Sequence, residues 1–132
     1  MQSERVLQRH VIAWLKAERI WHLKVHGGPM QRAGVPDLLL CVKDAGGSGR
    51  FVAIELKTVT GKVSPLQRHE MLAIINSGGF AITCRSLDDV REVVRWAREP
   101  HVFGTDVARI LVAKQVEYID AGLADEVYKK AQ

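Results

Sequence analysis

The first third of the chain has the pattern of apolar and polar residues expected of a helix followed by a strand. Apolar side chains recur every three to four positions, the spacing of one helix face; they are Val6, Leu7, Val11, Trp14 and Leu15. Ser3 stands before them as an N-cap candidate, so we predict a helix from about residue 4 to residue 19. Strand-forming residues then fill 20–26, until Gly27-Gly28-Pro29 ends the run.

Two apolar runs in the middle of the chain predict a β-hairpin. Residues 37–42 and 51–57 are strands by composition, and the glycine-rich segment 44–49 between them is a turn. Because the turn is centred between its two middle residues, the numbers of facing residues should add up to about 93. Asp37 and Glu55 fall within one residue of this register. We therefore expect their side chains to lie opposite each other.

The next part of the chain predicts two helices around one short strand. Ser64 followed by Pro65 is typical of a helix start, because the hydroxyl caps the helix and proline suits its first position. Residues 80–84 are an apolar strand, and Ser86 caps a helix that ends near Arg98. The predicted order is thus helix, three strands, helix, strand, helix.

Residues 101–132 are expected to form a helical extension of a domain that spans residues 1–100. Thr105 can cap a helix that carries apolar residues at near-helical spacing; they are Val107, Ile110, Leu111, Tyr118 and Ile119. One face of this helix needs burial. We predict that it packs on a second chain and makes a homodimer, and packing over the edge of the chain's own sheet is the alternative.

The composition is that of a globular domain and permits a nucleic-acid partner. Of the 132 residues 47% are apolar and 26% are charged, which excludes general disorder. The net charge of +4 and the pI of 9.3 permit a polyanionic partner without identifying one. The sequence shows neither a signal-peptide pattern nor an apolar run that could span a bilayer, so we expect a cytoplasmic protein with no membrane partner.

The two cysteines, Cys41 and Cys84, each lie within an apolar run. A cysteine side chain packs as a small apolar group, so both are predicted to be buried free thiols. Because they lack a C-x-x-C spacing, zinc bound by cysteine is not predicted.

The candidate chemistry is concentrated on the predicted hairpin. Glu55 and Lys57 are two residues apart on a strand, so their side chains point to the same side. By themselves they could be a solvated face, and Asp37 after Pro36 could be a turn residue. Opposite each other, however, Asp37 and Glu55 would have Cβ atoms about 4.5–5.5 Å apart, and two carboxylates that close repel unless a cation lies between them. Oxygen ligands favour Mg²⁺ or Mn²⁺.

Three short segments add their order and spacing to this pattern. They are Gly34-Val35-Pro36-Asp37-Leu38, Glu55-Leu56-Lys57 and Gly61-Lys62-Val63-Ser64-Pro65-Leu66-Gln67. Together they resemble the virus-type replication-repair nuclease (VRR-NUC) family of the PD-(D/E)XK nuclease superfamily, over roughly residues 3 to 98. The resemblance implies a restriction-endonuclease-like α/β fold, in which helices flank a mixed central sheet, and a metal-dependent nuclease activity.

The resemblance also implies roles for the residues of the hairpin. Asp37 and Glu55 would hold the metal, together with the backbone carbonyl of Leu56. Lys57 would orient the attacking water and stabilise the charge that develops on the phosphate in the transition state.

Two further site residues are implied by the resemblance, both on helices. Glu4 matches an acidic residue on the first helix that helps to hold a metal or its water, and Gln67 matches a helix glutamine beside the site. From the residues alone, Glu4 is only a favourable acid at a helix N-terminus and Gln67 only an exposed residue of a first turn.

The predicted substrate is DNA. Arg32, Lys62 and Arg68 flank the site in sequence and are expected to contact DNA phosphates, although solvated surface charges would give the same pattern. Branched, flap or junction DNA in replication or repair is implied by the family alone. Two alternatives remain open: a nuclease that cuts RNA on the same fold, and a non-catalytic module that binds nucleic acid.

Overall fold

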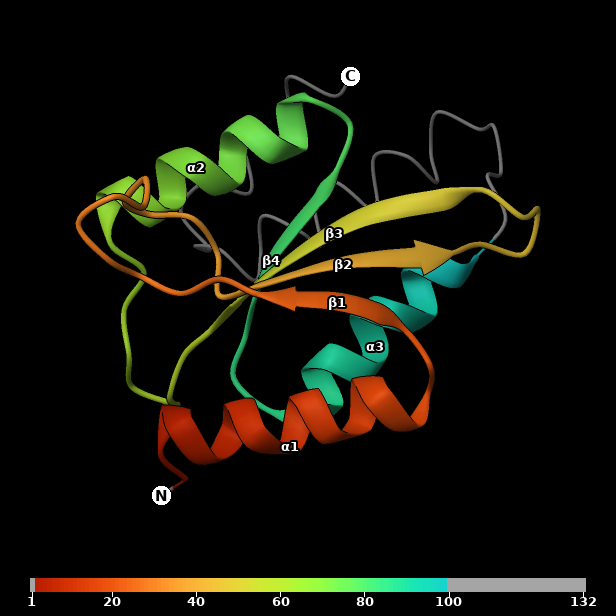
Figure 1. The fold of residues 1–132 in the computed structure, drawn as a ribbon, viewed down its shortest axis with the longest axis horizontal. Helices are drawn as coiled ribbons and strands as arrows, with labels where there is room; N and C mark the ends of the chain where they lie inside the picture. The colour runs from red at the N-terminus through yellow and green to blue at the C-terminus, as the bar shows by residue number, and fades with distance from the viewer. Residues whose placement is uncertain (1, 100–132) are drawn as a thin grey trace.

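The computed structural model describes residues 2–99, and the predicted order of elements is confirmed within them (Figure 1). The elements are α1 (Glu4–Ala17), β1 (Trp21–Lys24), β2 (Leu38–Lys43), β3 (Gly49–Leu56), α2 (Pro65–Asn76), β4 (Phe80–Cys84) and α3 (Leu87–Arg98). The predicted helices after Gly104, and with them the extension over residues 101–132, lie outside the described residues. No described helix is long and apolar enough to cross a membrane.

Each helix begins at the serine that the sequence indicated. The Ser3 hydroxyl accepts a hydrogen bond from the Val6 N–H at 3.2 Å at the start of α1. At the start of α3, the Ser86 hydroxyl accepts from the Asp89 N–H at 3.1 Å. Such bonds satisfy N–H groups that have no partner within the first helical turn, which is why serine is a strong start signal.

The four strands form one mixed sheet in the order β1-β2-β3-β4. The first three strands are antiparallel neighbours, whereas β4 runs parallel to β3 because the chain crosses over through α2 between them. In the hairpin, Leu38 faces Ile54 and Leu40 faces Val52. The numbers of facing residues therefore add up to 92, one less than the sum that the turn predicted. Continuing this register by one residue places Asp37 opposite Glu55.

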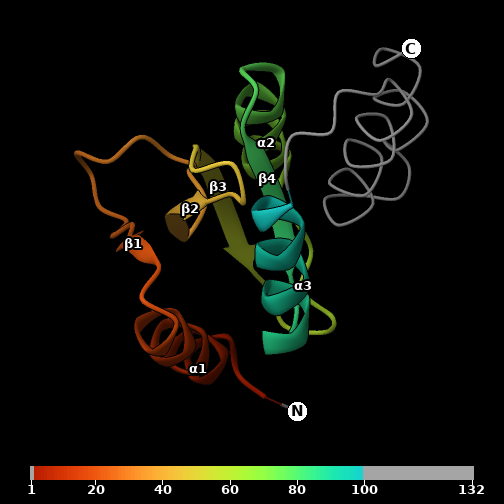
Figure 2. The same ribbon diagram turned by 90° about the vertical axis from the view of Figure 1, so that its right-hand side faces the viewer.

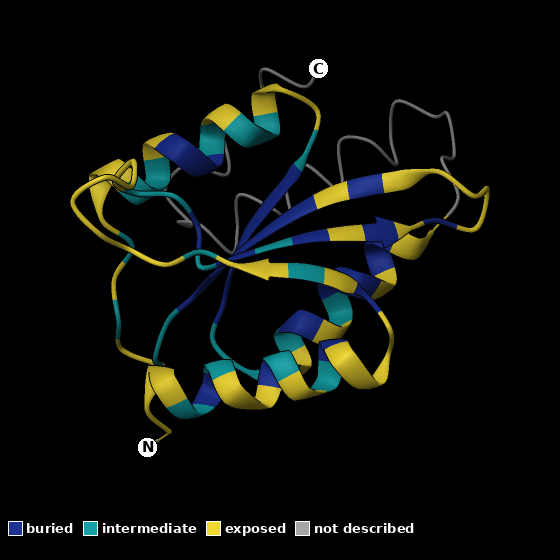
Figure 3. Cartoon of the chain, viewed as in Figure 1, coloured by how far each residue is buried: buried dark blue, intermediate teal, exposed yellow. Residues whose placement is uncertain are grey.

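The sheet is covered on both faces, so this is a layered α/β fold. Helices α1 and α3 pack on one face and α2 on the other, as Figure 1 shows below and above the sheet. Figure 2 shows the same arrangement from the side. Leu38, Ile54 and Leu56 belong to the larger core beneath α1 and α3, whereas Ala53 and Ala81 pack under α2. Figure 3 shows the burial of the sheet between the exposed outer faces of the helices.

Two local predictions were wrong. The first strand spans only Trp21–Lys24 and not 20–26, because it pairs with β2 alone and is largely exposed. The Cys41 thiol is exposed and not buried, because β2 alternates between buried and exposed positions and Cys41 lies between buried Leu40 and buried Val42. The prediction of a buried free thiol is confirmed for Cys84.

Candidate active site

The candidate site lies where the start of β2 meets the end of β3. Asp37 immediately precedes β2 and Glu55 is the penultimate residue of β3. The N-terminal turns of α1 and α2 point to the same end of the molecule, on the left in Figure 1. The fold therefore gathers at one end of the sheet the segments in which sequence analysis placed Asp37, Glu55, Lys57, Glu4 and Gln67.

Asp37 is held by the backbone on both sides. Its Oδ2 accepts a hydrogen bond from the Leu56 N–H at 2.8 Å, so the carboxylate reaches across to β3. Its backbone carbonyl accepts from the Val25 N–H at 2.8 Å, which ties the residue to the segment after β1. The position of Asp37 is thus fixed by β3 and by the segment after β1, as expected for a side chain that must hold a ligand in place.

Glu55 is a buried carboxyl group with one oxygen that no described residue satisfies. Only 2% of the residue is exposed. Its Oε1 accepts a hydrogen bond from Gln67 Nε2 at 2.9 Å, while Oε2 is buried and has no hydrogen-bond partner among the described residues. An unsatisfied buried carboxylate oxygen is costly, and it is an observation that a bound cation would explain.

The pKa of Glu55 is raised from 4.5 to about 8. Burial is the largest cause, followed by the negative charge and the closeness of the Asp37 carboxyl group; Glu4 contributes further in the same direction. The positive charge of Lys57 acts in the opposite direction and offsets only part of the shift. Without a bound cation, the site therefore favours the neutral, protonated form of Glu55 near pH 7.

Gln67 connects the first turn of α2 to Glu55. Its side-chain Oε1 accepts from the Ser64 backbone N–H at 2.9 Å. The backbone N–H of Gln67 donates to the Ser64 hydroxyl at 3.1 Å, which completes a capping box. Because the Ser64 N–H can only donate, the amide oxygen must face it, and the Nε2 group is left to donate to Glu55. The same side chain therefore starts the helix and orients the carboxyl group.

Lys57 is not on a solvated face, because its side chain is only 15% exposed. Its Nζ lies 3.8 Å from Glu55 Oε1, and its backbone N–H donates to the Cys84 carbonyl at 3.1 Å, next to the last β3–β4 pair. The parallel strand β4 thus holds the lysine in the same corner as the two carboxyl groups.

Two hollows meet at Asp37. One, of about 280 Å³, is lined by Glu4, Arg5, Gln8, Asp37 and Leu56. The other, of about 270 Å³, is lined by Asp37 and by residues of the loop between β1 and β2, which include Gly27 and Gly28. Asp37 is therefore accessible from both sides of the corner.

The donors in this corner fit a hard divalent cation. Asp37 and Glu55 offer oxygen atoms only, and their mutual repulsion would be relieved by a cation between them. Among the described residues, no group of three or more His, Cys, Asp and Glu side chains is placed to hold a metal ion. The donor set is thus small, as it is for Mg²⁺, which keeps several of its own waters at phosphate sites.

Comparisons with known proteins agree with this geometry. The family model of the VRR-NUC domain matches residues 3–88. This chain belongs to the VRR-NUC family. A solved structure named "VRR_NUC domain protein" is similar in fold, with a TM-score of 0.63 and 18% sequence identity, and the match covers 78% of this chain and 97% of that chain. Among curated proteins, none matches this chain.

Membership of the VRR-NUC family confirms the resemblance and the PD-(D/E)XK-like α/β fold that it implied. Members of this family are generally nucleases. The five candidate catalytic residues lie within the matched segment, which runs from the start of α1 to the start of α3.

One residue that supports the site in this VRR-NUC domain was missed by sequence analysis. The Arg85 guanidinium donates through Nη1 to the carbonyls of Thr58 at 2.7 Å and Gly61 at 2.6 Å. It thereby braces the loop that follows Lys57. No local signal could have revealed this, because the accepting carbonyls lie more than twenty residues away in the sequence.

Of the predicted DNA contacts, Arg32 has a second role in the structure. Its Nε and Nη2 groups donate to the Glu70 carboxylate at 2.8 and 2.7 Å, which ties the loop before β2 to α2. Gly34 of the same loop also lies against α2, so close that a Cβ atom there would lie 2.8 Å from the Leu66 carbonyl oxygen. Lys62 is exposed between Lys57 and α2, and Arg68 is half-buried on α2.

Proposed function

We propose that this VRR-NUC domain is a metal-dependent nuclease that hydrolyses phosphodiester bonds in DNA. The observation that carries the proposal is the buried carboxyl group of Glu55, which has an unsatisfied oxygen next to Asp37 and Lys57 in a corner with two hollows. A buried, strained set of charges with access to solvent is typical of a catalytic site and costly as a structural feature.

Asp37, Glu55 and the backbone carbonyl of Leu56 would hold Mg²⁺ or Mn²⁺, with Glu4 holding the ion or its water. When bound, such an ion polarises a phosphoryl oxygen and makes hydroxide available near neutral pH. The Leu56 N–H donates to Oδ2 of Asp37, and Gln67 Nε2 donates to Oε1 of Glu55. The other oxygen of each carboxyl group, Oδ1 of Asp37 and Oε2 of Glu55, would then bind the ion.

Lys57 would act on the reacting phosphate directly. Its ammonium group is a fixed positive charge in a partly buried corner, where it can orient the attacking water and stabilise the negative charge that grows in the transition state. Gln67 and Arg85 are positioning residues, since the first orients Glu55 and the second braces the loop after Lys57.

For the substrate, we propose branched, flap or junction DNA handled in replication or repair by a homodimer. The family supports this choice, and the positive net charge of +4 is compatible with it. Lys62 and Arg68, near the start of α2, and Arg32, which is 70% exposed and has N–H groups beyond those that Glu70 occupies, are the proposed phosphate contacts.

The test is a cleavage assay on single-stranded, duplex, flap and four-way DNA and on matched RNA, with Mg²⁺, Mn²⁺ or a chelator. We expect metal-dependent cleavage of a branched DNA and none with the chelator. Asp37→Asn should abolish cleavage and the rise in melting temperature caused by Mg²⁺, while keeping an acceptor for the Leu56 N–H. Asp88→Asn on the exposed part of α3 is the matched control and should behave as wild type.

Two results would overturn the proposal. One is the absence of cleavage on every substrate with either metal, which would favour a module that only binds nucleic acid. The other is cleavage of RNA in preference to all DNA substrates, which would favour the RNA nuclease.

A further inference from the structure

The hollow on the α1 side of Asp37 contains an arginine that no part of the described fold uses. Arg5 lines this hollow together with Glu4, Gln8, Asp37 and Leu56. It makes no hydrogen bond or ion pair with any residue in the described range 2–99, although two carboxylates line the same hollow. Its guanidinium group is therefore available to a ligand.

Three other cations around the site already have protein partners. Arg32 is held by the Glu70 carboxylate, Arg85 by backbone carbonyls, and Lys57 lies beside Glu55. Lys62 and Arg9 also lack a partner among the described residues, but of these unmatched cations it is Arg5 that lines the hollow beside Asp37.

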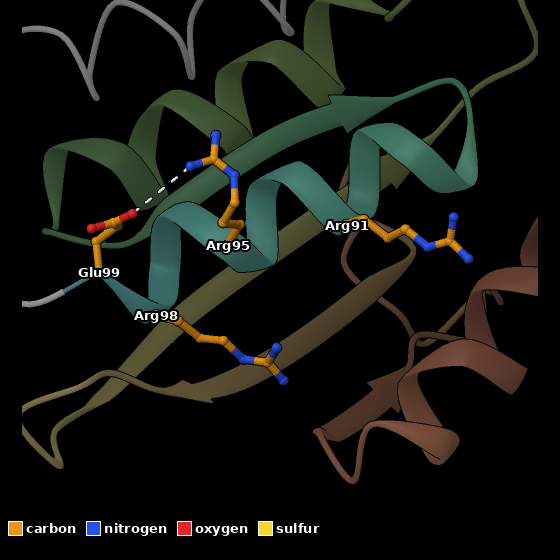
Figure 4. A pocket seen from close by; sticks show the side chains of 4 residues that line it. All are labelled: Arg91, Arg95, Arg98 and Glu99. Atoms are coloured by element: carbon orange, nitrogen blue, oxygen red, sulfur yellow. Dashed lines mark ion pairs between the residues drawn. The ribbon is translucent and has the colours of Figure 1, made fainter.

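Another hollow that contains arginines, of about 300 Å³, lies on α3 (Figure 4), and its charges are mostly paired along the helix. It is lined by Arg91, Arg95, Arg98 and Glu99. Arg95 lies 3.8 Å from Glu99, and Arg91 lies 3.0 Å from Asp88, both on the same helix. Exposed pairs of this kind are ordinary features of a helix surface. Arg98 has no side-chain partner among the described residues, but this hollow shares no lining residue with those at Asp37, so it gives little reason to expect a ligand of the same site.

The place of Arg5 in the helix is unfavourable for stability. It is the second residue of α1, where the positive end of the helix dipole repels a cation. An arginine at this position that gains no ion pair within the described fold lowers the stability of the helix. Such a cost is understandable if the side chain serves a ligand.

The charge balance of the corner favours a singly charged anion such as a phosphodiester group. With a divalent ion bound, the carboxylates of Glu4, Asp37 and Glu55 leave one negative charge, which Lys57 cancels. Arg5 is the charge that makes the occupied corner positive, by one unit, which matches one phosphodiester group. A guanidinium group can donate two parallel hydrogen bonds to its oxygens.

We propose that Arg5 binds a phosphate of the DNA strand in the hollow on the α1 side of Asp37, next to the phosphate that is cut. The inference rests on the proposed nuclease function and adds the path of the strand, which leaves the metal corner along the first turn of α1. Arg5 is a substrate-binding residue, and its contact with the neighbouring phosphate holds the scissile phosphate over Asp37.

The test compares Arg5→Gln with Arg9→Gln in the full chain. Both variants remove one charge from an exposed position of α1, but Arg9 does not line the hollow. Binding of a fluorescent DNA duplex is measured by anisotropy over a range of salt concentrations. Ca²⁺, which has the same charge and also takes oxygen ligands, replaces Mg²⁺ to separate binding from cleavage.

We expect Arg5→Gln to weaken binding about ten-fold or more, the scale of one lost charged hydrogen bond. Its plot of log affinity against log salt should be shallower by about one unit, and Arg9→Gln should bind as wild type. The melting temperature of Arg5→Gln should equal or exceed that of wild type, because an unfavourable charge leaves the helix N-terminus.

Unchanged binding by Arg5→Gln, or an equal loss in Arg9→Gln, would overturn the inference. If wild type cleaves DNA while Arg5→Gln binds as well as wild type does, the nuclease proposal stands and the inference falls. If binding depends on Arg5 but no DNA is cut with Mg²⁺ or Mn²⁺, the phosphate contact of Arg5 stands, whereas its role beside a scissile phosphate and the nuclease proposal fall.

Discussion

At the scale of single residues, the carboxyl group of Glu55 makes stability depend on pH. Burial and the neighbouring Asp37 raise its pKa to about 8 in the folded protein, against 4.5 as the ordinary value. The folded state therefore binds a proton more tightly than the unfolded state does. Between pH of about 4.5 and about 8 the unfolded chain releases this proton and the folded protein retains it, so this group's contribution to stability falls as pH rises.

We predict that the melting temperature of the metal-free protein falls more steeply over this pH range in wild type than in Glu55→Gln. The glutamine removes the titrating group while keeping an oxygen that can accept from Gln67. Thermal unfolding in a chelator buffer from pH 4.5 to pH 8 measures both curves. Parallel curves would mean that Glu55 titrates in the folded state much as it does in the unfolded chain.

The second prediction at this scale concerns Lys57. Lys57→Ala should lower the cleavage rate by about 10²–10³, the typical effect of losing one transition-state contact, with little change in metal affinity. Lys57→Arg should restore only part of the rate, because the planar guanidinium is larger than the ammonium group that sits 3.8 Å from Glu55. A Lys57→Ala protein that bound Mg²⁺ poorly but cleaved normally at saturation would assign the lysine a structural role.

At the scale of elements, the site is assembled from segments that each hold another segment's side chain. The first turn of α2 orients Glu55 through Gln67, and strand β3 holds Asp37 through the Leu56 N–H. Arg85 after β4 braces the loop that follows Lys57. The geometry of the corner therefore depends on how these elements pack against one another.

We predict that Arg85→Ala lowers kcat by roughly ten- to a hundred-fold, because small displacements of a catalytic group are costly. KM should change little, since Arg85 binds the backbone of the loop and is not one of the proposed DNA contacts. The loss of its hydrogen bonds to the loop should also destabilise the fold by roughly 1–3 kcal/mol. Arg91→Ala, which removes an exposed ion pair with Asp88, is the control and should change neither quantity appreciably. A normal kcat in a destabilised Arg85→Ala protein would restrict the arginine to a role in folding.

At the scale of the whole molecule, the prediction concerns residues 101–132, which lie outside the described residues. We predict that the full chain is a homodimer and that a chain ending at Pro100 is a monomer, because the apolar positions after Gly104 need a partner surface. Mass measured by light scattering over a range of concentrations tests both forms. A monomeric full chain at high concentration, or a dimeric truncated chain, would contradict this prediction.

Much of the fold and part of the site followed from the sequence because the signals were local. The three helix starts depended on a serine and its next three residues, and the hairpin register depended on the turn that joins its strands. That register also placed Asp37 against Glu55 before any packing was known. The error at Cys41 arose because an apolar run does not say which of its alternate positions a helix will cover.

Only the tertiary structure decided what surrounds these residues. The burial that raises the pKa of Glu55 exists only once the helices pack on the sheet, and Gln67, Arg85 and Arg32 find partners on other elements. The hollow beside Arg5 forms between α1 and the end of the hairpin. Local sequence determines the elements and the identity of the charged groups, whereas desolvation and partner choice depend on contacts between residues far apart in the chain.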